Sequence, residues 1–203
     1  MKNPKAFQIP SSPPLWGDLR GLGLIRIIIT QPFFFQGEKE QIENHFLEDE
    51  NLVLHLRKPD SAAADYEDLL QKINQKYHSR TMLHEHYHLY EKYQTRGIHF
   101  STAKRELAET TPCIGSKSTS CHELTEIKSI EGKFDYTFLS PIFSSISKQG
   151  YKGNLDMKEI EEFLQQKRSI KVIALGGITS ERVEQIEALG FDGYAMLGAA
   201  WRV

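Results

Sequence analysis

A segment rich in hydroxyl groups follows one candidate strand of this chain. Residues 144–148 read Ser-Ser-Ile-Ser-Lys, shortly after the strand predicted at Tyr136–Leu139 and the turn expected at Pro141. Hydroxyl groups and an ammonium on one loop could bind an anion such as a phosphate. An ordinary polar surface loop has the same composition, so the other strand ends must decide between the two interpretations. The candidate anion ligands are Ser145, Ser147 and Lys148.

Glycines follow the last two predicted strands. Gly176 and Gly177 come directly after the seventh strand, and Leu197 and Gly198 stand at the end of the eighth. Glycine lets backbone amides approach an anion closely. In a barrel of alternating strands and helices, phosphate commonly binds at the loops after strands seven and eight. The two loops together therefore predict a phosphate site.

Basic side chains and an imidazole stand at the ends of other strands. Arg57 and Lys58 follow the second strand, and the planar guanidinium of Arg57 suits phosphate oxygens. His122 lies two residues beyond Ser120. An imidazole beside a hydroxyl is a candidate general acid or base, because it titrates near neutral pH. The plain alternatives are an exposed ion pair for Arg57 and a surface histidine at a helix start for His122.

Residues 84–88 read His-Glu-His-Tyr-His and invite a metal interpretation. On a strand, His84 and His86 would share one face, as two zinc ligands could. A zinc site needs further ligands from other strands, and no second compact cluster supplies them. We therefore interpret this run as a polar loop that begins a helix.

The bulk composition excludes several classes of protein. A chain of 203 residues with a formal charge of -2 fits one large domain, and the near-neutral charge argues against a nucleic-acid binder. The apolar runs are far shorter than the roughly 20 residues of a membrane helix, and no secretory signal follows the first lysines. We expect a cytoplasmic protein with no membrane partner, in which Cys113 and Cys121 are reduced.

The elements that position these residues alternate regularly between strand and helix. We predict strands at Leu24–Thr30, Leu52–Leu56, Thr81–His84, Gly97–Phe100, Cys113–Lys117, Tyr136–Leu139, Lys171–Leu175 and Gly193–Leu197. Helices are expected between them, including one at Cys121–Ile130. Such units predict an all-parallel α/β fold, the (β/α)8 TIM barrel, with an open doubly wound sheet as the alternative.

We expect residues 1–23, rich in proline, to be an irregular N-terminal segment and residues 24–203 to be a single barrel domain. The sequence ends at Val203, directly after the eighth strand, which leaves no room for an eighth helix. Either the sequence is truncated there, or the N-terminal segment or a neighbouring subunit, as in a homodimer, covers the gap.

With these residues in place, the chain resembles the thiamine phosphate synthase and thiazole tautomerase superfamily along Leu24–Trp201. The matching motifs are Arg57, Gly97-Ile98-His99, Ser120-x-His122, residues 135–148, Ile173–Ile178 and Asp192-Gly193. The resemblance implies a TIM barrel that binds a thiazole phosphate. In the synthases, hydroxymethylpyrimidine diphosphate binds beside it with magnesium, the pyrimidine cation forms as diphosphate leaves, and the thiazole nitrogen attacks it.

The resemblance also assigns site residues. The diphosphate and pyrimidine side would comprise Arg57, Lys58, His84, Ser120, Ser145, Ser147 and Lys148. The thiazole phosphate side would comprise Gly176, Gly177, Leu197 and Gly198. The residues nearest the chemistry would be Ser120, His122 and Lys148.

The magnesium side departs from the family pattern. His84 and Glu85 stand where the synthases have Asn-Asp, and Lys104 stands where they have a second aspartate. Glu85 is then the one candidate metal ligand, and Lys104 offers no oxygen to magnesium. Three functions stay open: a synthase, which we favour, a metal-independent thiazole tautomerase with His122 as acid and base, and a non-catalytic binder of thiazole phosphate.

Overall fold

The computed structural model describes residues 23–143 and 156–201 of the chain. Its strands are β1 Ile25–Ile29, β2 Val53–Leu56, β3 Thr81–Leu83, β4 Gly97–Phe100, β5 Ser116–Cys121, β6 Tyr136–Leu139, β7 Lys171–Leu175 and β8 Gly193–Met196. Its α-helices are α1 Glu38–Glu48, α2 Ala63–Lys72, α3 Leu89–Tyr93, α4 Leu107–Thr110, α5 Leu124–Ile130, α6 Met157–Leu164 and α7 Val183–Ala188. The 3-10 helices are η1 Gln75–Arg80, η2 Thr102–Lys104, η3 Ser180–Arg182 and η4 Gly198–Ala200. No helix in these ranges is long and apolar enough to cross a membrane.

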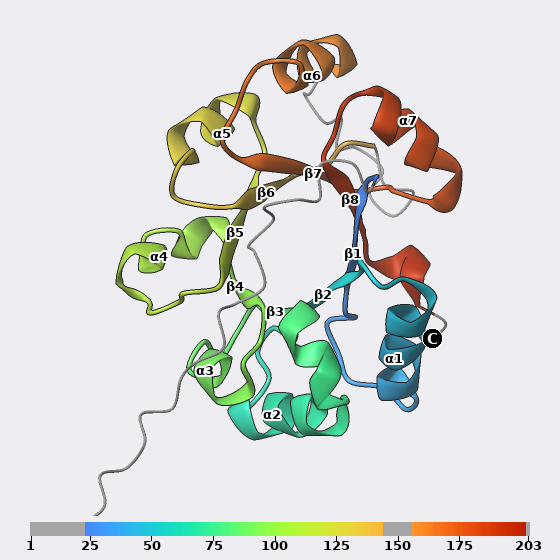
Figure 1. Cartoon of the computed structure of the whole chain (residues 1–203), viewed down its shortest axis with the longest axis vertical. Helices are drawn as coiled ribbons and strands as arrows, with labels where there is room; N and C mark the ends of the chain where they lie inside the picture. The colour runs from blue at the N-terminus through green and yellow to red at the C-terminus, as the bar shows by residue number, and fades with distance from the viewer. Residues whose placement is uncertain (1–22, 144–155, 202–203) are drawn as a thin grey trace, which may run out of the picture.

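The strands form a closed barrel in chain order, from β1 to β8. Every pair of neighbours is parallel, including β1 with β8, where Ile27 lies opposite Ala195. Figure 1 shows the helices arranged around the outside of this ring of strands. The predicted (β/α)8 barrel is confirmed. All strand ends that carry the candidate residues therefore open at the same mouth.

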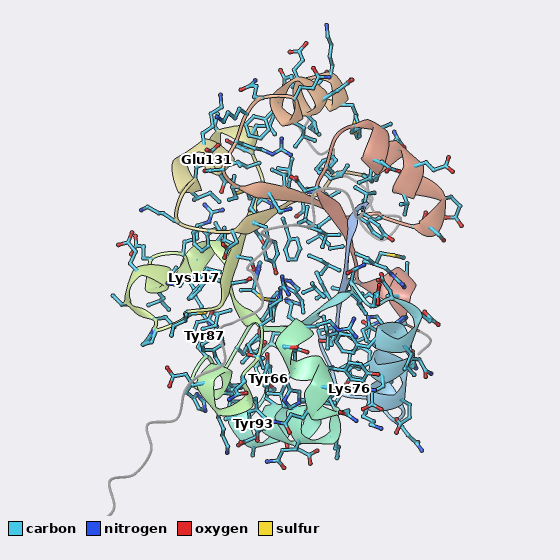
Figure 2. The ribbon with its side chains drawn as sticks, viewed as in Figure 1. Tyr66, Lys76, Tyr87, Tyr93, Lys117 and Glu131 are labelled. Atoms are coloured by element: carbon cyan, nitrogen blue, oxygen red, sulfur yellow. The ribbon has the colours of Figure 1, made fainter. Side chains whose placement is uncertain are left out.

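Strand alternation separates an inner from an outer layer of side chains. On β4, Ile98 and Phe100 belong to the buried layer between barrel and helices, while His99 points the other way, into the barrel. The apolar part of the barrel interior is lined by Ile25, Ile27, Ile29, Val53, Met82, Tyr136, Phe138, Ile173 and Ala195. Side chains fill this interior (Figure 2), so the site must lie at the mouth above it.

The helix α2 fixes the end of β2, the strand that leads to Arg57. Tyr66 of α2, labelled in Figure 2, is fully buried, and its hydroxyl donates to the carbonyl of Leu56 at 2.6 Å. Where β8 meets β1, Trp201 follows the last strand, and its indole nitrogen donates to the carbonyl of Ile29 at 2.8 Å. In the described part of the chain, β8 is followed by η4 and then Trp201.

The fifth strand was predicted in the wrong place. We expected it at Cys113–Lys117, whereas Ile114 is 76% exposed and the strand is Ser116–Cys121. This strand is almost entirely polar and mostly buried. Ser118 Oγ has a partner inside the barrel, His99, and Thr119 Oγ1 accepts from Arg105, whereas the buried hydroxyl of Ser116 has no partner among the described residues. The correction moves Cys121 from the predicted helix into β5 and places Ser120 inside the strand.

Candidate active site at the barrel mouth

Three histidines from neighbouring strands meet at the mouth of the barrel. His55 lies on β2, His84 directly after β3 and His99 on β4. His55 Nδ1 is 2.8 Å from His84 Nε2, and the rings of His84 and His99 stack with centroids 4.1 Å apart. Phe138 lies against both His55 and His99, with ring centroids 4.9 and 5.1 Å away. The alternation of β2 and β4 directs these imidazoles inward.

Burial keeps the three imidazoles neutral. His55 and His99 are almost completely buried, and His84 is partly exposed to the mouth. Desolvation, reinforced by Arg57, lowers the pKa of His99 to about 3. The pKa values of His55 and His84 also lie well below the usual value, mainly through desolvation. At neutral pH the cluster is therefore a set of uncharged nitrogen donors and acceptors.

The hydrogen bonds around this cluster extend to a tyrosine and two serines. His55 Nε2 is 2.6 Å from the hydroxyl of Tyr136, whose pKa burial raises well above its usual range. His99 Nδ1 is 2.9 Å from Ser118 Oγ, and its Nε2 is 3.3 Å from Ser120 Oγ. Ser120, predicted from the sequence as a site residue, is thus joined to the histidine cluster.

His122 lies at the rim beyond β5. Its backbone amide donates to Glu126 Oε1 at 2.9 Å, which fixes the residue at the start of α5. Its side chain is exposed, and Nδ1 is 2.8 Å from the carbonyl oxygen of Ser140. Because a carbonyl only accepts, Nδ1 carries the hydrogen, and Nε2 of the neutral ring is left as a base. The predicted acid/base role is chemically possible in this geometry.

The loops after β6 and β7 are locked together beside His122. Phe143 donates its amide to the carbonyl of Gly176 at 3.1 Å. Gly176 and Gly177 have φ values of 99° and 64°, and a Cβ on Gly177 would lie 2.9 Å from Phe143 Cβ. Only glycine fits both the left-handed backbone and the close approach. Within the described residues, neither glycine amide donates a hydrogen bond, so both N–H groups are left to donate to an anion.

Leu197 and Gly198, the other predicted phosphate residues, begin the turn after β8. Gly198 starts η4, and a Cβ added there would meet no atom within 4 Å. Ser145, Ser147 and Lys148 lie outside the described residues.

Lys58 is placed differently from what a diphosphate ligand requires. Its side chain is fully buried and its ammonium donates to the carbonyls of Gln31 and Phe33 and, at 2.5 Å, to Glu38 Oε1. An ammonium has three hydrogens, so these acceptors use them all. Desolvation lowers the pKa of Lys58 and raises that of Glu38. In this arrangement Lys58 holds the loop between β1 and α1, and Arg57 beside it remains the cation of the mouth.

The residues near Glu85 do not fit the magnesium that the family resemblance implies. Glu85 Oε2 accepts the backbone amide of Lys58 at 3.0 Å, and desolvation raises the pKa of Glu85 despite the nearby charges of Arg57 and Lys104. Magnesium prefers carboxylate and water oxygens. A single carboxylate between two cations is a poor ligand set, and in the described residues the only clustered candidate ligands are the three histidines.

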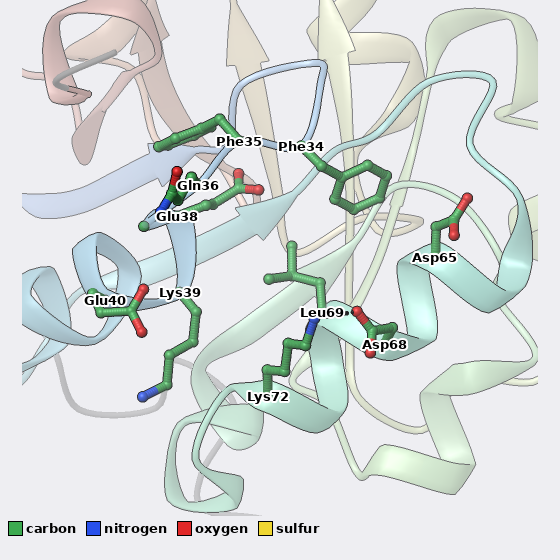
Figure 3. A pocket seen from close by; sticks show the side chains of 11 residues that line it. Phe34, Phe35, Gln36, Glu38, Lys39, Glu40, Asp65, Asp68, Leu69 and Lys72 are labelled. Atoms are coloured by element: carbon green, nitrogen blue, oxygen red, sulfur yellow. Dashed lines mark hydrogen bonds and ion pairs between the residues drawn. The ribbon is translucent and has the colours of Figure 1, made fainter.

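A separate groove of about 660 Å³ lies between the loop from β1 to α1 and the helix α2 (Figure 3). Its wall includes Phe34 and Leu69, with Asp68 and Lys72 paired at 2.6 Å near its edge. Of the predicted site residues that the structure describes, none lines it, whereas Glu38, the partner of Lys58, does. We therefore place the chemistry at the strand ends and not in this groove.

Comparison with known proteins agrees with this geometry. The sequence pattern of the family described as thiamine monophosphate synthase matches residues 27–200. The chain belongs to that family. A thiamine phosphate pyrophosphorylase structure from Bacteroides thetaiotaomicron is 34% identical, with a TM-score of 0.74 and coverage of 87% of this chain and 84% of that one.

Other members of the thiamine monophosphate synthase family are similar to this chain over part of their length or in fold. A thiamine-phosphate synthase of Anoxybacillus flavithermus is 30% identical over 112 residues, which are 54% of this chain and 52% of that protein. The chain thus spans about half the length of the first curated relatives it matches. A thiamine phosphate pyrophosphorylase from Pyrococcus furiosus, 15% identical with a TM-score of 0.69 over 87% of this chain and 86% of that one, shares the fold.

The sequence predicted a site at the mouth of the barrel but did not predict the cluster of His55, His84 and His99. His84 was expected to pair, if at all, with His86, yet His86 Nε2 lies 2.9 Å from the carbonyl of Ser61 and away from the cluster. The real partners of His84 are His55 and His99. Both occupy inward positions near the ends of β2 and β4, the two strands on either side of β3, and this shared position was the signal available in the sequence.

Proposed function

We propose that this chain is a thiamine phosphate synthase, which joins hydroxymethylpyrimidine diphosphate to thiazole phosphate and releases diphosphate. The observation that carries the proposal is a single mouth with two anion-binding points. Arg57 follows β2 at one point, and the amides of Gly176 and Gly177 follow β7 at the other. Two phosphorylated substrates fit such a mouth, whereas a single phosphate ligand needs only one of these points.

In the proposed reaction, the bond between the pyrimidine methylene and the diphosphate oxygen breaks first. The oxygen leaves with the electron pair, and the guanidinium of Arg57 binds the growing negative charge in a bidentate way. The thiazole nitrogen then donates its lone pair to the methylene carbon, which forms the carbon–nitrogen bond. Lys148, outside the described residues, is proposed as the second cation. The proposed reaction does not use magnesium, because a single carboxylate, Glu85, beside two cations is a poor ligand set for that ion.

The buried surface of the mouth supports such a cationic intermediate. His55, His84 and His99 are uncharged, so they add no repulsion to a positive pyrimidine. Of the three, only His84 is partly exposed to the mouth, so we propose that the pyrimidine contacts His84. We propose that the pyrimidine binds on this histidine side and the thiazole phosphate on the glycine side.

The test is a coupling assay with purified full-length protein and both substrates, with magnesium and with a chelator. We expect thiamine phosphate to form, and Arg57→Ala to lower its rate by roughly 100-fold, as for loss of one stabilising donor. Lys128→Ala, an exposed charge change on α5, is the matched control and should keep full activity. Absence of product under both metal conditions would refute the synthase proposal.

One observation favours a second candidate, thiazole tautomerase. Tautomerisation is a proton transfer, and because Nδ1 of His122 is held by the carbonyl of Ser140, Nε2 is the nitrogen of this ring that can exchange a proton with a substrate. This proposal predicts that the thiazole carboxylate phosphate tautomer is converted without metal and that His122→Gln abolishes the conversion. Conversion that survives His122→Gln would exclude His122 as the base.

The partners follow from the same proposal. Both substrates are small phosphorylated molecules, and we propose that the protein binds them in the cytoplasm. The homodimer expected from the sequence stays a prediction.

A further inference from the structure

We propose that His55, His84 and His99 form a binding site for a divalent transition-metal ion of borderline softness, such as Zn²⁺. One nitrogen of each ring lies within 4.8 Å of the corresponding nitrogens of the other two. Imidazole is a ligand that such ions prefer, and three imidazoles with an open fourth position are a known catalytic arrangement for zinc. This inference does not rest on the proposed function.

The hydrogen bonds identify which nitrogens would ligate. His55 Nε2 contacts the hydroxyl of Tyr136 at 2.6 Å, and His99 Nδ1 contacts Ser118 Oγ at 2.9 Å. In metal sites, the nitrogen that does not ligate donates its hydrogen to such an outer partner, which fixes the tautomer and the ring orientation. This leaves His55 Nδ1 and His84 Nε2 for the metal, together with His99 Nε2, whose 3.3 Å contact with Ser120 Oγ the metal would replace.

The distances require a small adjustment. Two nitrogens on a tetrahedral zinc ion are about 3.3 Å apart, given Zn–N bonds of about 2.05 Å. His55 Nδ1 and His84 Nε2 are 2.8 Å apart and share a hydrogen, which the metal would replace. The ring of His84 must also turn, because it stacks on His99 at 21°, and both ring planes must contain the ion. His84 can do so since it follows β3 and is partly exposed.

Charge and solvation decide what else would bind there. The nearby guanidinium of Arg57 repels a dication. An anion in the fourth position, hydroxide or a phosphate oxygen, would offset that repulsion and face the mouth.

The test is zinc binding by the metal-free full chain, measured by isothermal titration calorimetry, with Co²⁺ absorption as a second readout. We expect one ion per chain. His84→Gln should weaken binding at least roughly 100-fold, and Tyr136→Phe, which removes an outer partner, about 10-fold. His88→Gln changes an exposed histidine four residues from His84 and should leave binding unchanged.

Circular dichroism establishes that each variant is folded, and His84→Gln, at the least buried ligand, is the mildest change. No stoichiometric zinc binding by the wild-type chain would overturn the inference. Binding that is lost in His88→Gln but kept in His84→Gln would overturn it as well, because the ion would then sit on the surface. Failure of the synthase assay leaves these outcomes unchanged, since the titration uses the metal alone.

Discussion

Replacing Lys58 by methionine should destabilise the protein in a way that depends on pH. The change keeps much of the volume but leaves the buried carboxylate of Glu38 without its cation, and Glu38 Oε2 already has no partner among the described residues. The folded state can avoid a buried lone charge only if Glu38 binds a proton. From the ordinary value of 4.5, protonation costs about 1.36 kcal/mol per pH unit, or about 3.4 kcal/mol at pH 7.

The sign of the pH dependence follows from the same numbers. In Lys58→Met the pKa of folded Glu38 rises further above 4.5, so the folded state keeps a proton that the unfolded chain has lost. Stability is then lost as the pH rises from 4.5 toward the folded pKa. At pH 5 protonation costs only about 0.7 kcal/mol. Because the pKa of Glu38 is already raised in the wild type, the destabilisation should shrink by at most about 2.7 kcal/mol between pH 7 and pH 5. The lost bonds to Gln31 and Phe33 add a further cost of about 1 kcal/mol each at both pH values.

Urea unfolding of the wild-type chain and Lys58→Met at pH 7 and pH 5 measures these differences. The double variant Lys58→Met/Glu38→Gln is the matched control, because it has no carboxylate at position 38 and its own unfolding free energy should lack this pH-dependent contribution. If Lys58→Met costs the same at pH 7 and pH 5, Glu38 does not carry the penalty, and the buried ion pair is not what holds the loop from β1 to α1.

Two further predictions concern the ends of β7 and β8. Gly177→Ala forces a left-handed alanine against Phe143, so it should lower the free energy of unfolding by about 2 kcal/mol and weaken thiazole phosphate binding measured by calorimetry. The control is Gly132→Ala, at a position with φ 78° and open space around it. This variant should lose only the free energy of the backbone strain and should bind thiazole phosphate as the wild type does. Unchanged binding in Gly177→Ala would contradict a phosphate site there. Trp201→Phe removes the indole bond to Ile29 and should lower the unfolding free energy by about 1 kcal/mol in urea, and no loss would mean that this bond adds nothing to closure of the barrel.

The fold could be predicted from the sequence because the barrel strands are mostly short apolar runs between helices. β4, β6 and β7 were predicted with the bounds that the structure has. β5 was misplaced because its residues, Ser-Lys-Ser-Thr-Ser-Cys, have no apolar pattern. A strand whose burial depends on hydroxyl partners from neighbouring strands cannot be recognised from its own residues.

The candidate site was predictable to the level of the mouth and not beyond. Arg57 and the glycines after β7 could be assigned from their positions at strand ends, as the barrel geometry directs. The role of Lys58 could not, because its three acceptors come from the preceding loop and from Glu38. Whether a cation faces the ligand or a buried carboxylate depends on one step of strand alternation, which the sequence does not resolve.

The release of diphosphate tests the central claim most directly. With the full chain and both substrates, we predict that diphosphate appears only when thiazole phosphate is present, with one equivalent of thiamine phosphate for each diphosphate released. Arg57→Ala should slow both products together. Diphosphate release at the same rate without thiazole phosphate, or no release at all, would contradict the account.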